Sequence, residues 1–324
     1  MQAGCVQECP GCDHRHLTLD QSLGQKKAWL DTTLSSWKNK IEPVLSVSRE
    51  KQWSYRDRVC LKAQWSPDYG WHVGLQVRVY RNVKKTISIP NCPVHTSRVN
   101  QIIKWMIHHA PPYERFPLAY LAIVGGHLSF VLKTKQSVDL SWAKTLISDG
   151  KIASLWACYH PSAGNKVFSE SGWQLIEGPR WLSESGLYYG PDSFQQPVQD
   201  LHALSLKMVS DFFSPDKNSA ILDLYCGNGS SMALWSAAGA DFLGVELSGN
   251  AVAAAQMSFN QSNCLRGTTD QRLPQMHEWI QKRAHKNIFV YANPPRTGIE
   301  PQTAVWISQK LKPSKIAYLS CSAG

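Results

Sequence analysis

The sequence of 324 residues predicts an α/β protein in which two kinds of sheet follow one another. Residues 41–190 alternate apolar and polar side chains between Gly, Pro and Asn, which indicates a β-rich module. From about residue 199, helical and strand patterns alternate, which is typical of a parallel sheet. We therefore expect an amino-terminal segment 1–40, a β-rich module 41–190 and a parallel-sheet domain 191–324.

The amino-terminal segment combines a cysteine cluster with a helical pattern. Leu23, Leu30, Leu34 and Trp37 recur at helical spacing, so their side chains should lie near one face of a helix. In the β-rich module, the clearest strand patterns cover residues 71–80 and 118–124.

Positive charge is concentrated in the first part of the chain. Residues 1–190 carry 23 Lys and Arg against 14 Asp and Glu, a balance of +9, whereas residues 191–324 have a balance of +1. The first part also holds ten of the thirteen Trp residues. Basic charge mixed with aromatic side chains suits RNA, because phosphates are held by cations and exposed bases stack on rings. The alternative is a basic domain with Trp residues in its core.

The parallel-sheet domain opens with a buried strand that runs into a glycine turn. Residues 220–224 form the strand, Gly227 and Gly229 form the turn, and a helix should begin near Ser230. A second strand ends at Glu246, where a carboxylate is well placed to accept hydrogen bonds from two ribose hydroxyls. The glycines bring a ligand close to the backbone amides, so a nucleoside-bearing cofactor is expected here. The short glycine pattern suits S-adenosylmethionine better than a dinucleotide.

Cys321 follows an apolar run that reads as another parallel strand. It lies downstream of Asn-Pro-Pro-Arg-Thr-Gly at residues 293–298. A thiol at the carboxyl end of a strand, beside a pocket for a methyl donor, is suited to attack a pyrimidine. The alternative is that Cys321 is a small buried hydrophobic residue.

These motifs together resemble the RNA (uracil-5-)-methyltransferases. The order and spacing agree for residues 223–229, 244–246, 293–298 and 320–321, and Ser-Phe-Gln-Gln at 193–196 is similar to the family's Ser-Phe-Phe-Gln element. Tyr-Arg-Asp-Arg at 55–58 and Asn-Cys-Pro at 91–93 extend the resemblance over nearly the whole chain. The resemblance implies a Rossmann-like class I S-adenosylmethionine-dependent methyltransferase domain.

The resemblance also implies a mechanism. Carbon 5 of uracil is a weak nucleophile, so the Cys321 thiolate adds to carbon 6 and creates an enolate that takes the methyl group. A base then removes the carbon 5 proton, and the thiolate leaves. Asn293 would accept from the imide of the uracil ring, and Arg296 is expected near the target. The residues expected to bind the cofactor are Gln196, Asp223, Tyr225, Gly227, Gly229, Glu246, Asp270 and Asn293.

Asn293 also separates branches of the family, because many members carry Asp at this position. Asn-Pro-Pro-Arg resembles a short branch that acts on large-subunit ribosomal RNA and lacks an amino-terminal TRAM domain. We therefore expect a uridine of 23S ribosomal RNA in an unpaired loop as the target, with transfer RNA as an alternative.

Cys5, Cys9 and Cys12, with Cys92 far downstream, could hold a metal. Four thiolates suit either a 4Fe-4S cluster or zinc, and their spacing does not decide between them. The family resemblance favours the 4Fe-4S cluster.

The ends of the sequence carry further expectations. Relatives supply the base from a His-x-Glu segment beyond the catalytic cysteine, whereas this sequence stops three residues after Cys321. A catalytically impaired relative that binds RNA is therefore an alternative to an active enzyme. The start lacks a signal segment, and no apolar run approaches about 20 residues, so we expect a cytoplasmic monomer that does not enter a membrane.

Overall fold

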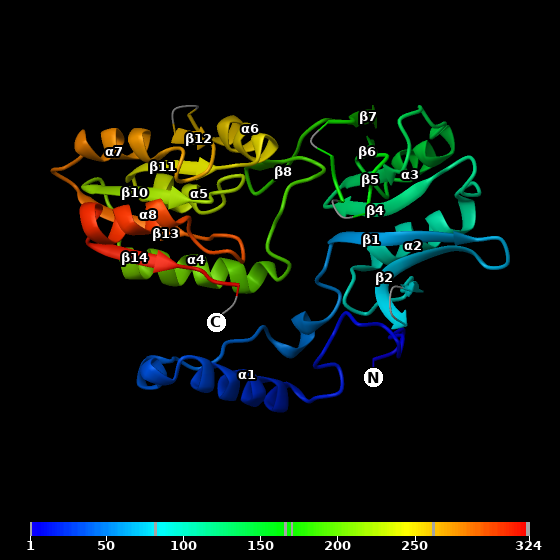
Figure 1. Cartoon of the computed structure of the whole chain (residues 1–324), viewed down its shortest axis with the longest axis horizontal. Helices are drawn as coiled ribbons and strands as arrows, with labels where there is room; N and C mark the ends of the chain where they lie inside the picture. The colour runs from blue at the N-terminus through cyan, green and yellow to red at the C-terminus, as the bar shows by residue number, and fades with distance from the viewer. Residues whose placement is uncertain (1, 81–82, 165–166, 170, 261–262, 322–324) are drawn as a thin grey trace. The chain divides into compact units, whose positions relative to one another are not determined.

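The computed structural model describes residues 2–80, 83–164, 167–169, 171–260 and 263–321 (Figure 1). The chain divides into two compact units. The first unit comprises residues 1–25, 45–182 and 195–198. The second comprises residues 26–44, 183–194 and 199–324.

The predicted helix in the amino-terminal segment is confirmed as α1 (Leu19–Thr33), which is followed by the 3-10 turns η1 (Ser35–Lys40) and η2 (Arg49–Gln52). Only Ser22 of α1 is buried. Trp29 is 50% exposed and Trp37 59% exposed. Of the residues that predicted the helix, Leu23 and Leu30 lie in α1 and are half-buried, whereas Leu34 and Trp37 lie beyond its end.

The first unit is built on a seven-stranded sheet with the strand order β3-β2-β1-β4-β5-β6-β7. All neighbours are antiparallel except β5 and β6, which are parallel. Both strand patterns identified in the sequence are confirmed, as β2 and β4. The strands are β1 (Arg58–Ser66), β2 (Gly70–Tyr80), β3 (Val83–Ser88), β4 (Leu118–Val124), β5 (His127–Leu132), β6 (Ser154–Tyr159) and β7 (Trp173–Glu177).

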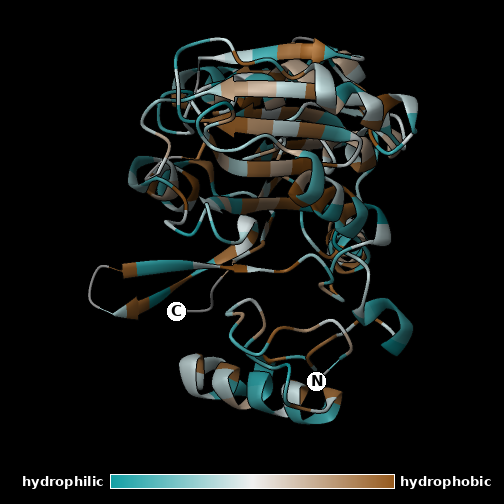
Figure 2. Cartoon of the chain, turned by 90° about the vertical axis from the view of Figure 1, so that its right-hand side faces the viewer, coloured by the Kyte–Doolittle hydropathy of each residue, from teal (hydrophilic) through white to brown (hydrophobic). Residues whose placement is uncertain are grey.

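One face of this sheet packs on helix α2 (Ser97–His109) and on the short helices η3 (Ser141–Lys144) and α3 (Thr145–Ser148). In β1 the residues Val59, Leu61 and Ala63 are buried in this core, whereas on the other face Cys60 and Gln64 are exposed and Lys62 is half-buried. This alternation follows from the period of two in a strand. The hairpin of β2 and β3 extends away from the rest of its sheet and alternates hydrophilic and hydrophobic stretches (Figure 2).

The second unit contains a five-stranded sheet with the order β12-β11-β10-β13-β14, in which every pair is parallel. This confirms the predicted parallel sheet. Its strands are β10 (Ser219–Leu224), β11 (Asp241–Glu246), β12 (Cys264–Arg266), β13 (Asn287–Ala292) and β14 (Lys315–Tyr318). The strands β8 (Leu182–Glu184) and β9 (Leu187–Tyr189) form a separate two-stranded sheet.

Hydrophobic side chains cover both faces of the parallel sheet. Ile221 and Phe289 belong to one core, whereas Leu222 and Val290 belong to the other. Burial on both faces is what a doubly covered parallel sheet requires. The helices of this unit are α4 (Gln199–Phe213), α5 (Met232–Ala237), α6 (Gly249–Ser258), α7 (Leu273–Gln281) and α8 (Pro301–Val305), which continues into the π-helical segment η5 (Trp306–Leu311).

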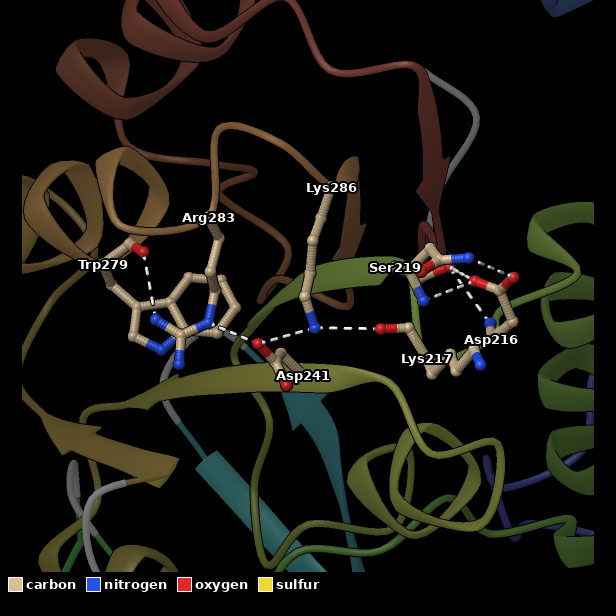
Figure 3. A network of polar contacts seen from close by, with 8 residues as sticks. Asp216, Lys217, Ser219, Asp241, Trp279, Arg283 and Lys286 are labelled. Atoms are coloured by element: carbon tan, nitrogen blue, oxygen red, sulfur yellow. Dashed lines mark hydrogen bonds and ion pairs between the residues drawn. The ribbon is translucent and has the colours of Figure 1, made fainter.

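Charged residues connect elements at the amino-terminal edge of the parallel sheet (Figure 3). Asp241, which begins β11, forms ion pairs with Arg283 at 2.8 Å and with Lys286 at 3.0 Å. Lys286 Nζ also donates to the carbonyl oxygen of Lys217 at 2.9 Å. The Arg283 guanidinium lies 4.2 Å from the centroid of the Trp279 ring. This edge is therefore tied together by opposite charges.

Within the ranges that the structure describes, no helix is both long and apolar enough to cross a bilayer.

Candidate active site

The predicted site residues of the second unit follow the carboxyl ends of its parallel strands. Leu224, the last residue of β10, pairs with Val245 of β11 and with Ala292 of β13. Ala292 pairs in turn with Tyr318, the last residue of β14. The segments that follow these strands therefore start along one edge, which is where open parallel sheets bind ligands.

The loop after β10 has the unusual backbone that its glycines predict. Gly227 and Gly229 have φ values of +58° and +91°, and Tyr225 is also left-handed, with a φ of +63°. A Cβ atom added at Gly227 would meet no atom within 4 Å, whereas one at Gly229 would lie 2.7 Å from the Phe259 ring. Gly227 thus borders open space that a side chain would enter, and Gly229 allows close packing behind the loop.

Glu246 lies against this loop. Its Oε2 accepts from the Gly227 amide at 3.1 Å, and its Oε1 accepts from the Ser248 amide at 2.7 Å. Each carboxylate oxygen has a second lone pair, so both can still accept from a ligand hydroxyl. Glu246 and the open side of Gly227 therefore fit a nucleoside-bearing cofactor such as S-adenosylmethionine.

Asp223 is buried in β10, with no exposed surface. Its Oδ2 accepts from the Trp235 indole at 2.7 Å. Burial raises its pKa to about 7, although hydrogen bonds from Ser231 and Trp235 act in the opposite direction. The predicted contact of Asp223 with the cofactor stays a prediction.

Glu300 links two loops at this edge, and the sequence analysis missed it. Its Oε2 accepts from the hydroxyl groups of Tyr225 and Thr269, and its amide donates to the Tyr225 hydroxyl at 3.3 Å. Burial, followed by the hydrogen bond to Glu300, raises the pKa of Tyr225 to about 12. Tyr225 therefore remains a protonated donor at neutral pH, and its ring is held by Glu300.

Asp270 holds the start of α8 in a similar way. Its Oδ1 accepts from the Thr303 amide at 2.8 Å and from the Thr303 hydroxyl at 2.7 Å. Glu300 directly precedes this helix, and Pro301 is its first residue. Proline at the first position of a helix is a helix-start signal, so the start of α8 could have been recognised from the sequence.

Cys321 and Asn293 follow neighbouring strands. The Leu319 amide donates to the carbonyl oxygen of Ala292 at 2.9 Å, and the Asn293 amide donates to that of Leu224 at 3.2 Å. Cys321 is exposed, and so is Arg296 in the loop after β13. The pairing of β13 and β14 therefore places an accessible thiol and Asn293 in the segments that follow two adjacent strands.

Cys226 presents a contrast within the same unit. It is buried, and its Sγ lies 3.6 Å from the Sγ of Cys264. The hydrogen bond with Cys264 and burial raise its pKa well above the usual thiol value. Because the thiolate is the reactive form, Cys226 is poorly suited to be a nucleophile.

Comparison with known proteins agrees with this arrangement. Residues 18–324 match the model of the tRNA (Uracil-5-)-methyltransferase family. The chain belongs to this family. The 23S rRNA (uracil(1939)-C(5))-methyltransferase RlmD of Shewanella sp. (strain W3-18-1) is 23% identical over 331 residues, which cover 97% of this chain and 71% of the relative. An uncharacterized RNA methyltransferase of Aquifex aeolicus is 24% identical over 337 residues, which cover 97% of this chain and 72% of the relative.

The fold agrees with a solved structure as well. The tRNA (uracil-54, C5)-methyltransferase of Pyrococcus abyssi, in complex with S-adenosyl-L-homocysteine, aligns with a TM-score of 0.69 and 18% identity. The alignment covers 99% of this chain and 77% of the Pyrococcus chain. This likeness confirms the predicted fold class for this member of the uracil-5-methyltransferase family.

Gln196, the remaining residue that family resemblance assigns to the cofactor, lies in the first unit. Its predicted role stays a prediction.

The four cysteines predicted to bind a metal also lie in the first unit of this uracil-5-methyltransferase. Cys5, Cys9, Cys12 and Cys92 line one cavity of about 30 Å³. Burial, followed by the charges of the other three thiols, raises the pKa of Cys12. Across the ranges described above, however, no group of three or more His, Cys, Asp or Glu side chains is arranged to hold a metal ion. Four cysteine thiols are the type of ligand that a 4Fe-4S cluster requires. The cluster itself stays a prediction.

Proposed function

We propose that this chain transfers a methyl group from S-adenosylmethionine to carbon 5 of a uridine in RNA, with Cys321 as the nucleophile. The observation that carries the proposal is the exposed thiol of Cys321, in the segment after β14, next to the strand that leads into Asn293. The same sheet edge bears the open Gly227 turn and Glu246. Membership of the uracil-5-methyltransferase family supports the reaction.

The chain's own residues would act at the uracil ring. S-adenosylmethionine supplies the methyl group on a sulfonium centre. The Cys321 thiolate would form a bond to carbon 6, and the electron pair of the 5,6 double bond would move to carbon 5. Carbon 5 would then bond to the methyl group as the carbon–sulfur bond breaks, with S-adenosylhomocysteine as the leaving group. Removal of the carbon 5 proton by a base restores the double bond and expels the thiolate. Asn293 would accept from the ring imide, and Arg296 would lie near the target nucleotide.

The proposed substrate is 23S ribosomal RNA. Asn-Pro-Pro-Arg at residues 293–296 supports the short ribosomal-RNA branch, and the Shewanella relative with 97% coverage of this chain is named for 23S rRNA. Transfer RNA is the second candidate, because the Pyrococcus protein that shares the fold is named for tRNA. When the protein is incubated with methyl-labelled S-adenosylmethionine and total RNA from a deletion strain, the label should enter the ribosomal RNA fraction. Incorporation into the transfer RNA fraction alone would reverse the assignment.

Trapping with 5-fluorouridine tests the nucleophile. Fluorine at carbon 5 does not leave as a proton, so the Cys321 adduct should persist through denaturing electrophoresis. Cys321→Ala should form no adduct, whereas the matched variant Cys226→Ala should retain it. An adduct with Cys321→Ala would assign the attack to another residue. Adduct formation without turnover on ordinary uridine would favour the impaired RNA-binding relative over the active enzyme.

We also propose that Cys5, Cys9, Cys12 and Cys92 bind a 4Fe-4S cluster, as the shared cavity and the donor type suggest. Anaerobically purified protein should be brown and contain iron, and Cys9→Ser or Cys12→Ser should lose both properties. Cys60→Ser is the control, because this exposed thiol of the same unit lies outside the set. Stoichiometric zinc without iron would replace the cluster with a zinc site.

A further inference from the structure

The antiparallel sheet of the first unit has a second face, which lies opposite the helices. Strand pairing places Lys62 of β1 beside Gly74 of β2 and beside Tyr120 of β4. The same register sets Arg78 of β2 directly opposite Lys84 of β3. Because directly paired residues point to the same side of a sheet, Lys62, Arg78 and Lys84 share this face.

These strands carry positive charges without negative ones. Within their residue ranges, β1, β2, β3 and β4 contain five Lys or Arg residues and neither Asp nor Glu. Like charges directly opposite one another, such as Arg78 and Lys84, destabilise a sheet. The arrangement therefore has an electrostatic cost that a bound anion would remove.

Lys62 lies in a field of other cations. Its Nζ is 4.2 Å from the centroid of the Tyr120 ring. Burial, followed by the charges of Lys133 and Lys84, lowers its pKa, and the Cys60 thiol is the one group that raises it. In the part of the chain that the structure describes, Lys62, Arg78 and Lys84 form no ion pair with an acidic side chain.

Other lysines of the same unit differ. Lys144 pairs with Glu177 at 2.9 Å, and Lys151 pairs with Asp149 at 3.1 Å. The cations on the sheet face are therefore set apart from surface lysines that have local acidic partners.

The cationic part of the face is open to solvent. Cys60, Gln64, Gln76, Arg78 and Lys84 are exposed and Lys62 is half-buried, whereas Thr86, which pairs with Gln76, is buried. The half of the face over β5 and β6 is different, because Val131 and Cys158 are buried there among residues that include Phe168 and Trp173. The open half is thus polar and positively charged, whereas the covered half is apolar.

We propose that the open face of β1, β2 and β3 binds the phosphate backbone of the substrate RNA. This proposal rests on the proposed function, since it names a second surface for the same RNA. Charge complementarity selects the occupant: the face offers Lys62, Arg78 and Lys84 in one strip, and a strand of RNA presents successive phosphates. Phosphate contacts of this kind position the RNA and do not read its sequence.

Salt dependence of RNA binding tests the face. The triple variant Lys62→Gln/Arg78→Gln/Lys84→Gln should bind a fluorescein-labelled oligouridylate more weakly than wild type. Its slope of log Kd against log salt should be smaller by about 2, at about 0.7 for each lost single-strand phosphate contact. The matched control is Lys104→Gln/Lys144→Gln/Lys151→Gln, which removes the same charge from the same unit outside this face. The control should retain the wild-type slope.

Two further measurements separate this proposal from the proposed function. In methyl transfer to RNA, the triple variant should show a raised KM for RNA with an unchanged kcat, and it should still form the 5-fluorouridine adduct at saturating RNA. The RNA-binding face would be overturned if wild type and the triple variant had equal salt slopes, or if the triple variant and the control lost RNA affinity equally. In either case methyl transfer would continue. Absence of methyl transfer and of adduct in the wild type would overturn the proposed function, whatever the slopes.

Discussion

Asp241 at the amino-terminal edge of the parallel sheet is held in the opposite way to Glu246 and Glu300 at its carboxyl edge. At the amino-terminal edge, Asp241 pairs with the cations Arg283 and Lys286 (Figure 3). At the carboxyl edge, Glu246 accepts from backbone amides, and Glu300 accepts from the hydroxyl groups of Tyr225 and Thr269. Cations neutralise Asp241, whereas neutral donors hold Glu246 and Glu300 in place.

This difference separates a structural carboxylate from carboxylates that can bind a ligand. An ion pair satisfies a carboxylate in both charge and geometry, and its contribution is to stability. A carboxylate that is oriented by N–H and O–H donors keeps its negative charge and its remaining lone pairs, so it can still accept from a ligand. The comparison predicts that substitutions at the two edges will affect different measurements.

The largest effect is expected from a pair of glycines, one at each edge. Gly227 and Gly239 both have positive φ, and both lack neighbours within 4 Å of an added Cβ. Val should therefore lower the free energy of unfolding in both variants, by about 1–2 kcal/mol or more. Only Gly227→Val should also abolish binding of S-adenosylhomocysteine in calorimetric titration. Unchanged affinity in Gly227→Val would remove the carboxyl edge as the cofactor site.

Asp223 should make stability fall as pH rises. Its folded pKa of about 7 lies above the ordinary value near 4, so between these values the folded state binds more protons than the unfolded state. The contribution of Asp223 to the free energy of unfolding should decrease by up to about 1.4 kcal/mol per pH unit between these two pKa values and then level off at higher pH. The free energy of unfolding measured in urea should be lower at pH 8 than at pH 5 in wild type. The difference should be smaller in Asp223→Asn. Identical pH profiles would contradict the raised pKa.

Glu300 should affect cofactor affinity more than it affects stability. Glu300→Ala removes the acceptor that holds Tyr225 and Thr269, so affinity for S-adenosylhomocysteine should fall about tenfold, the value of one charge-assisted hydrogen bond. Glu300→Gln keeps an acceptor oxygen and should restore part of the affinity. The Kd for RNA should stay constant in both variants. A parallel loss of RNA affinity would indicate a general disruption of the unit.

The smallest effect is expected at the amino-terminal edge. Asp241→Asn should lower the free energy of unfolding by about 0.5–1 kcal/mol, as expected for a partly exposed ion pair. Although burial raises the pKa of Asp241, Lys286 and Arg283 hold it below its ordinary value. The contribution of the Asp241 ion pairs to stability is therefore complete above the pKa of Asp241 in the unfolded chain. It is lost as pH falls through the lower pKa of the folded state. Cofactor affinity should not change, and any change would mean that the edges are coupled.

Much of the second unit could be predicted from the sequence, because its signals are local. The strand at residues 220–224, the turn at Gly227 and Gly229, and the carboxylate of Glu246 lie close together in the chain and appear where they were expected. The contacts of Glu300 could not be predicted in this way. Glu300 and Tyr225 are 75 residues apart, so only the parallel register of β10 and β13 brings them together.

The first unit was predicted less completely. Helix α2 was missed, although Thr96 accepts from the Val99 amide as an ordinary helix cap, and Ile102, Ile103 and Met106 form its buried face. The strand patterns on both sides outweighed this signal. The charges on the open sheet face could not be placed from sequence, because their alignment depends on which strands pair and in which register.

Among the described residues, the thiol proposed as the nucleophile follows the border strand of its sheet. β14 has four residues and pairs on one side with β13. Amides on such a border open more readily to solvent than those in the middle of a sheet, so β14 should exchange its hydrogens for deuterium sooner than β10 does. Its position is set through β13, the strand that leads into Asn293. A ligand that stiffens β13 should therefore slow exchange in β14 as well, and the thiol and the amide should become ordered together.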